Sequence, residues 1–286
     1  MSVAQASAEK QLNLGQTLHA VRRLLTHFAI AGTIIAIWEL ASLAGLVSPL
    51  ILPAPTKIGA AIIRLYFETG QVYWHFFVTM FEALTGFVIG CAIGLSLAIG
   101  AALSPTFRRY IAPYAVVFNV TPGIAMTPII IAWFGFGWNS KIALSALVVF
   151  FPVYVNTLTG LLHVDRDAQE MFRSLGASRV QTFFKLMLPE AAPLIVAGFK
   201  VAITGALAGT IVTEFASASE GVGLLMQRFS YSLDIASALS MLLTMSFMGL
   251  LLFSMVELLD RTVIFWKYGN RLDRVSAARA KRFRTR

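Results

Sequence analysis

Charged side chains are rare in this sequence, and a few of them stand inside long apolar segments. These are three carboxylates and one amine: Glu39, Glu82, Glu214 and Lys200. An ionised group within an apolar helix is costly unless it is paired or lines a polar cavity, so each is by default a candidate functional residue. Lys200 is the weakest candidate, because its long side chain can carry the amine out to an aqueous interface.

The sequence lacks the patterns that would make these groups catalytic or metal-binding. The histidines, at positions 19, 27, 75 and 163, show neither an H-E-x-x-H run nor another paired spacing. There is no G-x-x-x-x-G-K-[ST] run, so no phosphate-binding loop of the P-loop type is expected. We find no nucleophile with an accompanying base. The single cysteine, Cys91, lies in an apolar run and is interpreted as a small core residue. We therefore expect neither an enzyme nor a metal centre.

The elements that position these residues are predicted to be transmembrane helices. The 286 residues are 57% hydrophobic and 13% charged, whereas about one quarter of a soluble domain is charged. Six apolar segments are long enough to cross a hydrocarbon layer of about 30 Å as helices. They are residues 28–47, 77–103, 110–134, 141–162, 191–213 and 236–259. The first is too long for a secretory signal and is expected to stay attached. The predicted fold class is an all-α integral membrane protein.

A shorter segment, "LPAPTKIGAAIIRLYFETG" at 52–70, has a different pattern. Two prolines open it, and apolar residues then recur at helical spacing, at Ile58, Ile62 and Leu65. The opposite side is charged, with Lys57, Arg64 and Glu68. This pattern predicts an amphipathic helix that lies at the membrane interface or on its neighbours and does not cross the membrane.

Lysine and arginine are unevenly distributed between the two sides that six spans define. The terminal tails and the loops 104–109 and 163–190 hold 18 of them, against 4 on the other side. This asymmetry predicts that both termini and the 163–190 loop are cytoplasmic. We attribute the net charge of +9 to membrane orientation and anionic lipid, and not to nucleic acid.

The expected organisation follows from these spans. Residues 1–27 form a cytoplasmic tail, residues 28–259 the transmembrane domain, and residues 260–286 a basic cytoplasmic tail that serves as a topology and lipid anchor.

The 163–190 loop carries its own helix signals. Asp167 with Glu170 predicts a helix start of the capping-box kind. Gly176 stands where that helix would end, and glycine readily takes the left-handed conformation there. Ser178 with Gln181 repeats the capping signal, and Pro189 is expected to stop the second helix. The loop is therefore predicted to be helix, glycine turn, helix. This could serve to dock a partner or to lie on lipid headgroups, and periodicity alone does not decide between the two.

Two spans contain breaks and polar residues that suggest a route through the membrane. In the third span these are Asn119, Thr121, Pro122, Met126 and Thr127, next to prolines that should kink the helix or open it locally. In the fifth span they are Thr204, Gly205, Gly209 and Glu214. Gly205 and Gly209 form a G-x-x-x-G pair, so tight helix packing is the alternative to contact with a solute.

The polar loop resembles the "EAA" loop of ABC-importer permeases, whose pattern is Glu-Ala-Ala, three residues, Gly, nine residues, Ile-x-Leu-Pro. Here Glu170-Met171-Phe172 is followed by Gly176 and, after nine residues, by Leu186-Met187-Leu188-Pro189. Met171, Phe172 and Leu186 depart from the family residues. "LPAP" at 52–55, "PIIIAWFGFG" at 128–137, "FFPVYVNTLTGL" at 150–161 and "EFASASEGVGLLM" at 214–226 are also similar to family segments, in the same order.

The resemblance implies a type I ABC importer permease with six transmembrane helices and a cytoplasmic coupling helix in the bacterial inner membrane. Together these segments are similar to the permease subfamily that serves alkylsulfonate, taurine, nitrate, bicarbonate and thiamine-precursor uptake. The implied partners are two ATP-binding subunits, a second permease copy and an extracytoplasmic substrate-binding protein. No cofactor is expected in this chain, since ATP and Mg would be bound by the ATPase. The implied coupling residues are Glu170, Met171, Phe172, Ser174, Leu175, Gly176, Ala177, Ser178, Arg179, Leu188 and Pro189.

Three other interpretations compete with this one. A gradient-driven secondary transporter or channel would account for the spans but not for the cytoplasmic loop, and we see no inverted repeats. A membrane-embedded enzyme would need a catalytic cluster that we do not find. A scaffold that moves no solute would leave the breaks in the third and fifth spans unexplained. The expected solute is small and anionic, and the carboxylates are expected to be paired or away from its route.

Overall fold

The computed structural model describes residue 22, residues 25–217 and residues 219–264. Most of the predicted N-terminal tail, and the basic tail from residue 265 onward, lie outside the described residues. The chain divides into two compact units. The first unit comprises Met1–Gly70 with Phe229–Ser240, and the second comprises Gln71–Arg228 with Met241–Arg286.

The first unit contains an apolar helix and the predicted amphipathic segment. The apolar helix, Leu25–Leu43, is long enough to cross a membrane. The amphipathic segment forms α2 (Pro55–Ile63) and the π-helix η1 (Arg64–Glu68). The N-cap residue of α2, Ala54, makes no side-chain capping bond. The Glu39 carboxylate takes that role, because it accepts hydrogen bonds from the Thr56 N–H at 3.1 Å and from the Thr56 hydroxyl at 2.7 Å. Glu39 is therefore paired, and it stabilises the first turn of α2.

The two faces of this segment are as predicted. Ile58 and Leu65 are buried, whereas Lys57 and Arg64 are exposed. The Arg64 guanidinium donates to Asp234 Oδ2 at 2.9 Å and to Ser237 Oγ at 2.7 Å, within the same unit. Burial acts to raise the pKa of Asp234, but hydrogen bonds from Ser237 and Arg64 outweigh it and hold that pKa below its ordinary value of 3.8.

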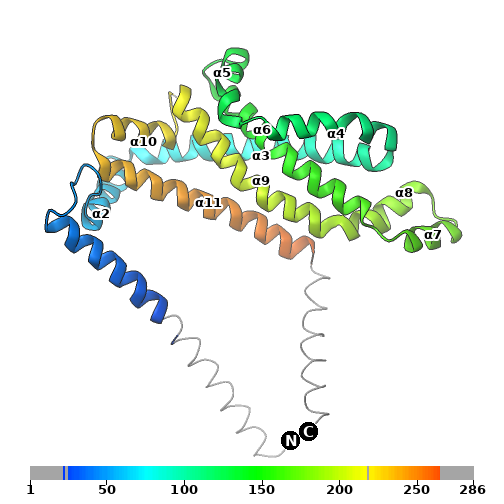
Figure 1. Cartoon of the computed structure of the whole chain (residues 1–286), viewed down its shortest axis with the longest axis horizontal. Helices are drawn as coiled ribbons and strands as arrows, with labels where there is room; N and C mark the ends of the chain where they lie inside the picture. The colour runs from blue at the N-terminus through cyan, green and yellow to red at the C-terminus, as the bar shows by residue number, and fades with distance from the viewer. Residues whose placement is uncertain (1–21, 23–24, 218, 265–286) are drawn as a thin grey trace, which may run out of the picture. The chain divides into compact units, whose positions relative to one another are not determined.

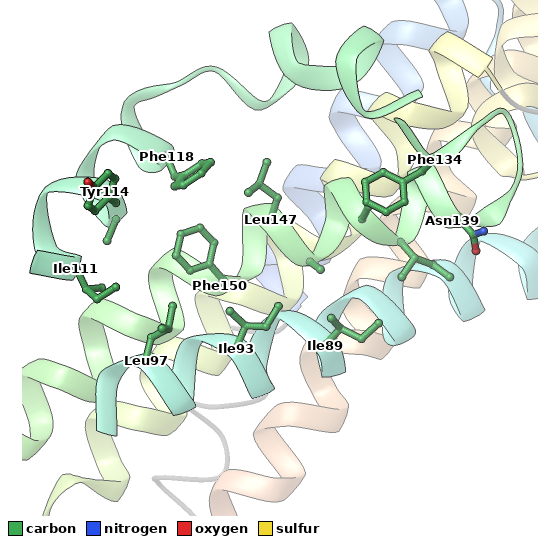
Figure 2. Close-up of a pocket in the computed structure, with 14 residues that line it drawn as sticks. Ile89, Ile93, Leu97, Ile111, Tyr114, Phe118, Phe134, Asn139, Leu147 and Phe150 are labelled. Carbon is green, nitrogen blue, oxygen red and sulfur yellow. The ribbon is translucent and has the colours of Figure 1, made fainter. Parts of the chain in front are cut away.

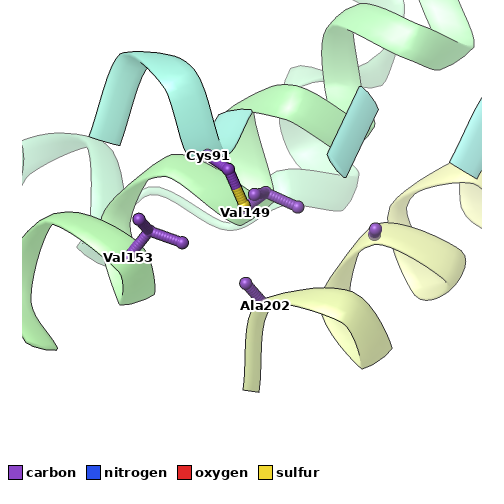
Figure 3. Packing of buried hydrophobic residues seen from close by; sticks show 5 residues of the cluster. Cys91, Val149, Val153 and Ala202 are labelled. Carbon is purple, nitrogen blue, oxygen red and sulfur yellow. The ribbon is translucent and has the colours of Figure 1, made fainter. Parts of the chain in front are cut away.

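The second unit is built on three long helices, α3 (Gln71–Leu103), α6 (Trp138–Leu162) and α9 (Leu188–Ser217) (Figure 1). They correspond to the second, fourth and fifth predicted spans. Small and apolar side chains from all three helices meet in one buried cluster, of which Figure 3 shows Cys91, Val149, Val153 and Ala202. Cys91 is thus a buried core residue, as expected from the sequence.

Glycine allows α3 and α6 to approach closely. A Cβ atom added at Gly90 of α3 would lie 2.6 Å from the carbonyl oxygen of Ala146 and 2.6 Å from Cβ of Val149. Atoms that close would have to move apart, and one of them belongs to the backbone. In a membrane the hydrophobic effect does not drive helices together, because lipid is as apolar as the side chains. Small residues let the backbones approach closely, and the packing contacts that result stabilise the helix pair.

The predicted third span, 110–134, is not one helix. It consists of the second half of α4 (Pro105–Val120) and α5 (Gly123–Phe134), which meet at an angle of 101°. The sequence predicted a kink or local opening at this place, and the break is confirmed but far sharper. Pro122 lacks an N–H and keeps the preceding Thr121 in an extended conformation, which ends α4.

The remaining helices complete five to six candidate spans among the described residues. α10 (Val222–Tyr231) is short, and α11 (Ile235–Val263) matches the predicted sixth span. Five helices are long and apolar enough to cross a membrane, and the bent pair α4–α5 can supply a sixth. Lys200 of α9 forms ion pairs with Glu257 and Asp260 of α11, so its amine has two carboxylate partners near the end of the predicted sixth span.

Candidate functional site

The polar loop folds as two helices, α7 (Arg166–Ser174) and α8 (Arg179–Thr182), and the start of α7 corrects one prediction. Asp165, not Asp167, is the N-cap residue, and its carboxylate accepts from the Asp167 N–H at 3.0 Å. The earlier aspartate takes the cap because its carbonyl already accepts the first helical bond, from Gln169. Asp167 then lies in the first turn, where its charge favours the helix N-terminus.

The turn between α7 and α8 is fixed at both sides. Gly176 has φ +80°, the left-handed conformation predicted for it. Its N–H donates to the Arg173 carbonyl at 2.9 Å and the Ala177 N–H donates to the Phe172 carbonyl at 3.0 Å, which is a Schellman ending. The capping box predicted at Ser178 is present, with reciprocal bonds of 3.2 and 2.8 Å to Gln181. The turn therefore has a single well-defined geometry.

The second helix of the loop does not stop at Pro189, contrary to the prediction. α8 continues through a π-helical turn, η2 (Phe183–Met187), directly into α9, giving one helical stretch from Arg179 to Ser217. Proline clashes with the carbonyl four residues earlier in a regular helix. A π turn lies just before the proline, and in it the Leu188 N–H bonds to the carbonyl of Phe183, five residues earlier. This wider hydrogen-bond spacing lets the helix continue through Pro189.

Most of the residues assigned to the coupling surface are exposed on this segment. Glu170, Ser174, Gly176, Ser178 and Arg179 are exposed, while Phe172, Ala177, Leu188 and Pro189 are partly buried. Four large apolar side chains are also exposed here: Met171 (55%), Leu175 (79%), Val180 (65%) and Phe184 (60%). We call these four the loop apolar patch.

The segment is anchored to the helices behind it. Phe183 is buried with Leu161 of α6 and with Ala191 and Ile195 of α9. Between α7 and the helix ends is a cavity of about 310 Å³, lined partly by Arg166, Glu170 and Arg173 of α7. The segment that carries the loop apolar patch is therefore held to the three-helix core through Phe183, next to Phe184 of the patch.

A larger cavity lies beside the break in the third span, in the second unit. It measures about 720 Å³ and is lined by side chains of α3 to α6, such as Ile93, Tyr114, Phe118 and Phe150 (Figure 2). Asn139 supplies one of its few polar groups, and none of its lining residues, all in the described chain, is charged. This cavity is apolar, and the predicted pathway residues are not among those that line it.

The structure distributes the pathway candidates of the third span around the bend. Asn119 and Pro122 are exposed, Thr121 and Met126 are partly buried, and Thr127 is buried. The Thr121 hydroxyl donates to the Val117 carbonyl at 2.8 Å. The bend thus presents neutral polar groups, with no carboxylate among these candidates.

The candidates of the fifth span fall into three environments. Thr204 is exposed and bonds to its own helix at the Val201 carbonyl. Gly205 and Gly209 face α6, where added Cβ atoms would lie 3.1 Å from Val148 Cγ1 and 3.3 Å from Ser145 Cα. Glu214 has no exposed surface and accepts from the Thr79 hydroxyl at 2.6 Å and the Gly223 N–H at 2.7 Å.

One buried charged residue is not among the predicted candidates. Lys141, one of the four basic residues on the side opposite the predicted cytoplasmic loops, is fully buried and donates to Glu82 Oε1 at 3.0 Å. The available signal was Glu82 itself, because a carboxylate inside a span requires a partner. The expectation that Glu82 is paired is met by this lysine.

Comparisons with known proteins agree with this arrangement. The family profile described as "Binding-protein-dependent transport system inner membrane component" matches residues 90–265. SsuC of Bacillus subtilis, a permease assigned to aliphatic sulfonate transport, is 33% identical over 83% of this chain and 86% of its own length. The formylaminopyrimidine transport permease ThiX of Halalkalibacterium halodurans is 29% identical over 82% and 92%.

The fold is also found in a solved structure. A chain of the MetNI methionine ABC transporter, in an inward-facing conformation, superimposes with a TM-score of 0.56 at 19% identity, over 70% of this chain and 97% of that one. The predicted resemblance and fold class are confirmed. The chain belongs to the binding-protein-dependent inner-membrane permeases of ABC importers, multi-pass proteins that have no ATPase domain of their own and work with ATPase subunits and binding proteins.

Proposed function

We propose that two copies of this chain form the translocation pathway for a small anionic solute, and that the segment from Asp165 to Pro189 receives the movement of the ATPase subunits. The observation that carries the second part is the loop apolar patch on a doubly fixed turn. Exposed apolar groups on a rigid cytoplasmic element favour a protein partner over solvent. A conformational change passes through such an element because it has one defined arrangement.

The coupling surface would consist of the residues that flank the Schellman turn. Met171 and Leu175 would enter a groove of the ATPase, with Glu170 and Arg179 at the rim. Met171 and Phe172 replace the small residues of the family pattern, so we expect the groove of the partner to be correspondingly wider. ATP and Mg would be bound only by the ATPase subunits, and no cofactor would be bound by this chain.

The orientation supports the same assignment. With both termini in the cytoplasm, as the lysine and arginine asymmetry predicts, α7 and α8 face the cytoplasm. The turn from α9 to α10 then faces the extracytoplasmic side, where a binding protein delivers the solute. The tails at 1–27 and 260–286 would anchor this orientation through anionic lipid.

An alkylsulfonate is the first solute class to test. SsuC, assigned to aliphatic sulfonates, and the taurine permease TauC of Escherichia coli are both similar to this chain, at 33% and 26% identity. The exposed pathway candidates Asn119 and Thr204 are neutral hydrogen-bonding residues, while Glu214 is buried. A route without bare carboxylates does not repel an anion.

The experiment is purification of the tagged full-length chain in mild detergent, followed by identification of co-purifying polypeptides. We expect a stoichiometric partner with a P-loop. Leu175→Asp should remove that partner because it places a charge in the docking groove, whereas Leu46→Asp should not. Leu46 is the matched control, since it is 78% exposed and Leu175 is 79% exposed.

Three results would each contradict a part of the proposal. Retention of the ATPase by Leu175→Asp would place the docking surface elsewhere. Uptake that is driven by an ion gradient in vesicles without ATP would identify a secondary transporter instead. For the solute, reconstituted transporter with its binding protein should accumulate an alkylsulfonate, and accumulation of a neutral pyrimidine alone would exclude the anionic class.

A further inference from the structure

The turn between α9 and α10 is held to the rest of the second unit through side-chain acceptors. Three successive amides donate hydrogen bonds there, those of Gly221, Val222 and Gly223, at 2.9, 2.9 and 2.7 Å. Their acceptors are side-chain atoms of α3 and α9: His75 Nδ1, Thr79 Oγ1 and Glu214 Oε2. We call these three acceptors the amide clamp. Amides at the start of a helix have no partner within that helix, so the amide clamp fixes where α10 begins.

The backbone of the turn lies directly against the clamp. Gly221 has φ +120°, a conformation that glycine adopts readily and other residues rarely do. A Cβ at Gly221 would overlap the Glu214 carboxylate, and a Cβ at Gly223 would lie 2.6 Å from Glu214 Oε2. The two glycines therefore allow an approach that no larger residue permits.

The hydrogen bond to His75 requires one protonation state of its ring. An amide N–H can only donate, so His75 Nδ1 must accept from Gly221 and carries no proton here. A second proton on the ring would turn Nδ1 into a donor that faces another donor, and the bond would be lost. Histidine in water takes up this proton near about pH 6.5. His75 lies in the second turn of α3 and is partly exposed, so a proton can reach it.

A second histidine has the opposite arrangement. His163 Nδ1 lies 2.8 Å from the Thr159 carbonyl oxygen. A carbonyl can only accept, so this Nδ1 already carries a proton, and a second proton on Nε2 leaves the bond intact. Protonation therefore removes a hydrogen bond at His75 but not at His163.

We propose that His75 is an acid-sensitive positioning residue: the neutral ring holds the start of α10 on α3, and protonation of the ring releases it. The charged groups around the ring are Arg228 of α10, Glu220 before the turn and, beside Gly221, Glu214. Arg228 and Glu220 act in opposite senses on a charged ring. Thr79 and Glu214 keep their amides when His75 is protonated, so the release is partial and reversible.

The release has a consequence for transport, and this consequence rests on the proposed function. With the predicted orientation, the start of α3 and the α9–α10 turn face the extracytoplasmic side, where the binding protein delivers the solute. Acidification of that side should therefore lower uptake through His75, whereas acidification of the cytoplasmic side should not.

Amide hydrogen exchange of the purified full-length chain measures the release directly. The peptide that contains residues 221–223 is compared between the unaltered chain and His75→Asn at the same pH. The substitution is remote in sequence, so the intrinsic exchange rates of the peptide are the same in both. Asparagine Oδ1, like histidine Nδ1, is bonded to Cγ, and it accepts a hydrogen bond without titrating in this range.

The two chains should differ only in acid. At about pH 7.5, where the histidine ring is neutral, we expect equal protection of this peptide. At about pH 5.5 we expect about five-fold lower protection in the unaltered chain than in His75→Asn, the effect of one lost hydrogen bond. Equal protection of the two chains at the lower pH would overturn the proposal.

Two further variants separate the acceptor from the ring. His75→Phe keeps a ring but has no acceptor, so its peptide should be poorly protected at both pH values. His163→Asn is the matched control and should reproduce the unaltered chain at both. Full protection in His75→Phe at the higher pH, or acid resistance in His163→Asn, would contradict the role given to His75. If His75→Phe does not accumulate, the comparison with His75→Asn still decides.

Uptake by the reconstituted transporter with its binding protein tests the consequence. Uptake should fall when the extracytoplasmic side is acidified, and His75→Asn should remove most of that fall. An equal fall in both would overturn the link between the amide clamp and uptake. Absence of uptake at any pH would count against the proposed function and leave the exchange result intact, and a failed exchange result would leave the importer function intact.

Discussion

Replacement of Gly176 by valine tests whether the turn between α7 and α8 transmits movement. Gly176 has φ +80°, and an added Cβ would meet nothing within 4 Å. The cost of the change is therefore conformational and not steric contact with neighbours. A β-branched residue in the left-handed region costs about 2 kcal/mol, which lowers the population of this turn relative to other conformations about thirty-fold.

The helices on either side should survive the change, because each has its own cap, at Asp165 and Ser178. We therefore expect Gly176→Val to insert and to be present in normal amounts. In reconstituted transporter it should lose solute uptake while ATP hydrolysis continues without being coupled to it. The two rates, measured on the same vesicles, give the coupling ratio, which is the amount of solute taken up per ATP hydrolysed.

A second glycine provides the matched control. Gly45 also has a positive φ, +71°, and open space around an added Cβ, but it lies after the first helix and not in the polar loop. Gly45→Val carries the same local strain and should leave uptake per hydrolysed ATP unchanged. A normal coupling ratio in Gly176→Val, or an equal loss in Gly45→Val, would refute the role given to the turn.

Three further changes have outcomes that follow from packing and charge. Gly90→Ala places a methyl group 2.6 Å from the Ala146 carbonyl oxygen and should cost about 1–3 kcal/mol, seen as a lower unfolding temperature. Lys200→Gln breaks two ion pairs to α11 and should lower the unfolding temperature, with a smaller difference at high salt. Asp234 has a lowered pKa, so the stability it contributes is present above about pH 4 and is lost as the pH falls through that lowered pKa. Asp234→Asn should therefore unfold at a lower temperature near neutral pH, and the difference should disappear in acid.

Each of these changes has its own check. At Gly59 an added Cβ meets nothing within 4 Å, so Gly59→Ala should not lower the unfolding temperature. If it lowers that temperature as much as Gly90→Ala does, the close approach of α3 and α6 is not the cause of the effect at Gly90. A salt-independent effect of Lys200→Gln would indicate lost packing and not lost charge. A difference between Asp234→Asn and the unaltered chain that grows in acid would show that the sign of the linkage is wrong.

Periodicity and composition were sufficient to predict five of the six spans as single helices, because the length of an apolar run is a local property. Caps and glycine turns were predictable where one residue decides the conformation, as at Gly176 and Ser178. Predictions failed where two signals competed over a few residues. Asp165 and Asp167 are both able to cap α7, and sequence alone does not rank them. Pro189 normally ends a helix, and the π turn that carries the helix past it has no sequence signature that we could use.

The contact between Glu82 and Lys141 could not be predicted from the sequence, because the two residues are 59 positions apart in the chain. Lys141 is the first residue of the predicted span 141–162, and only the packing of α6 against α3 buries it. The presence of Glu82 required a partner of some kind, but its identity depended on helix register. The 101° bend between α4 and α5 was likewise underestimated, since a proline predicts a break without fixing its angle.

The uninterrupted helix from Arg179 to Ser217 has a mechanical consequence. At about 1.5 Å per residue, its 39 residues make a rod about 58 Å long. One end carries the capping box beside the loop apolar patch, and Glu214 stands near the other. A tilt of about 5° about one end displaces the other by about 5 Å, roughly one helical turn. A tilt of this helix as one body therefore moves the loop apolar patch and the surroundings of Glu214 together.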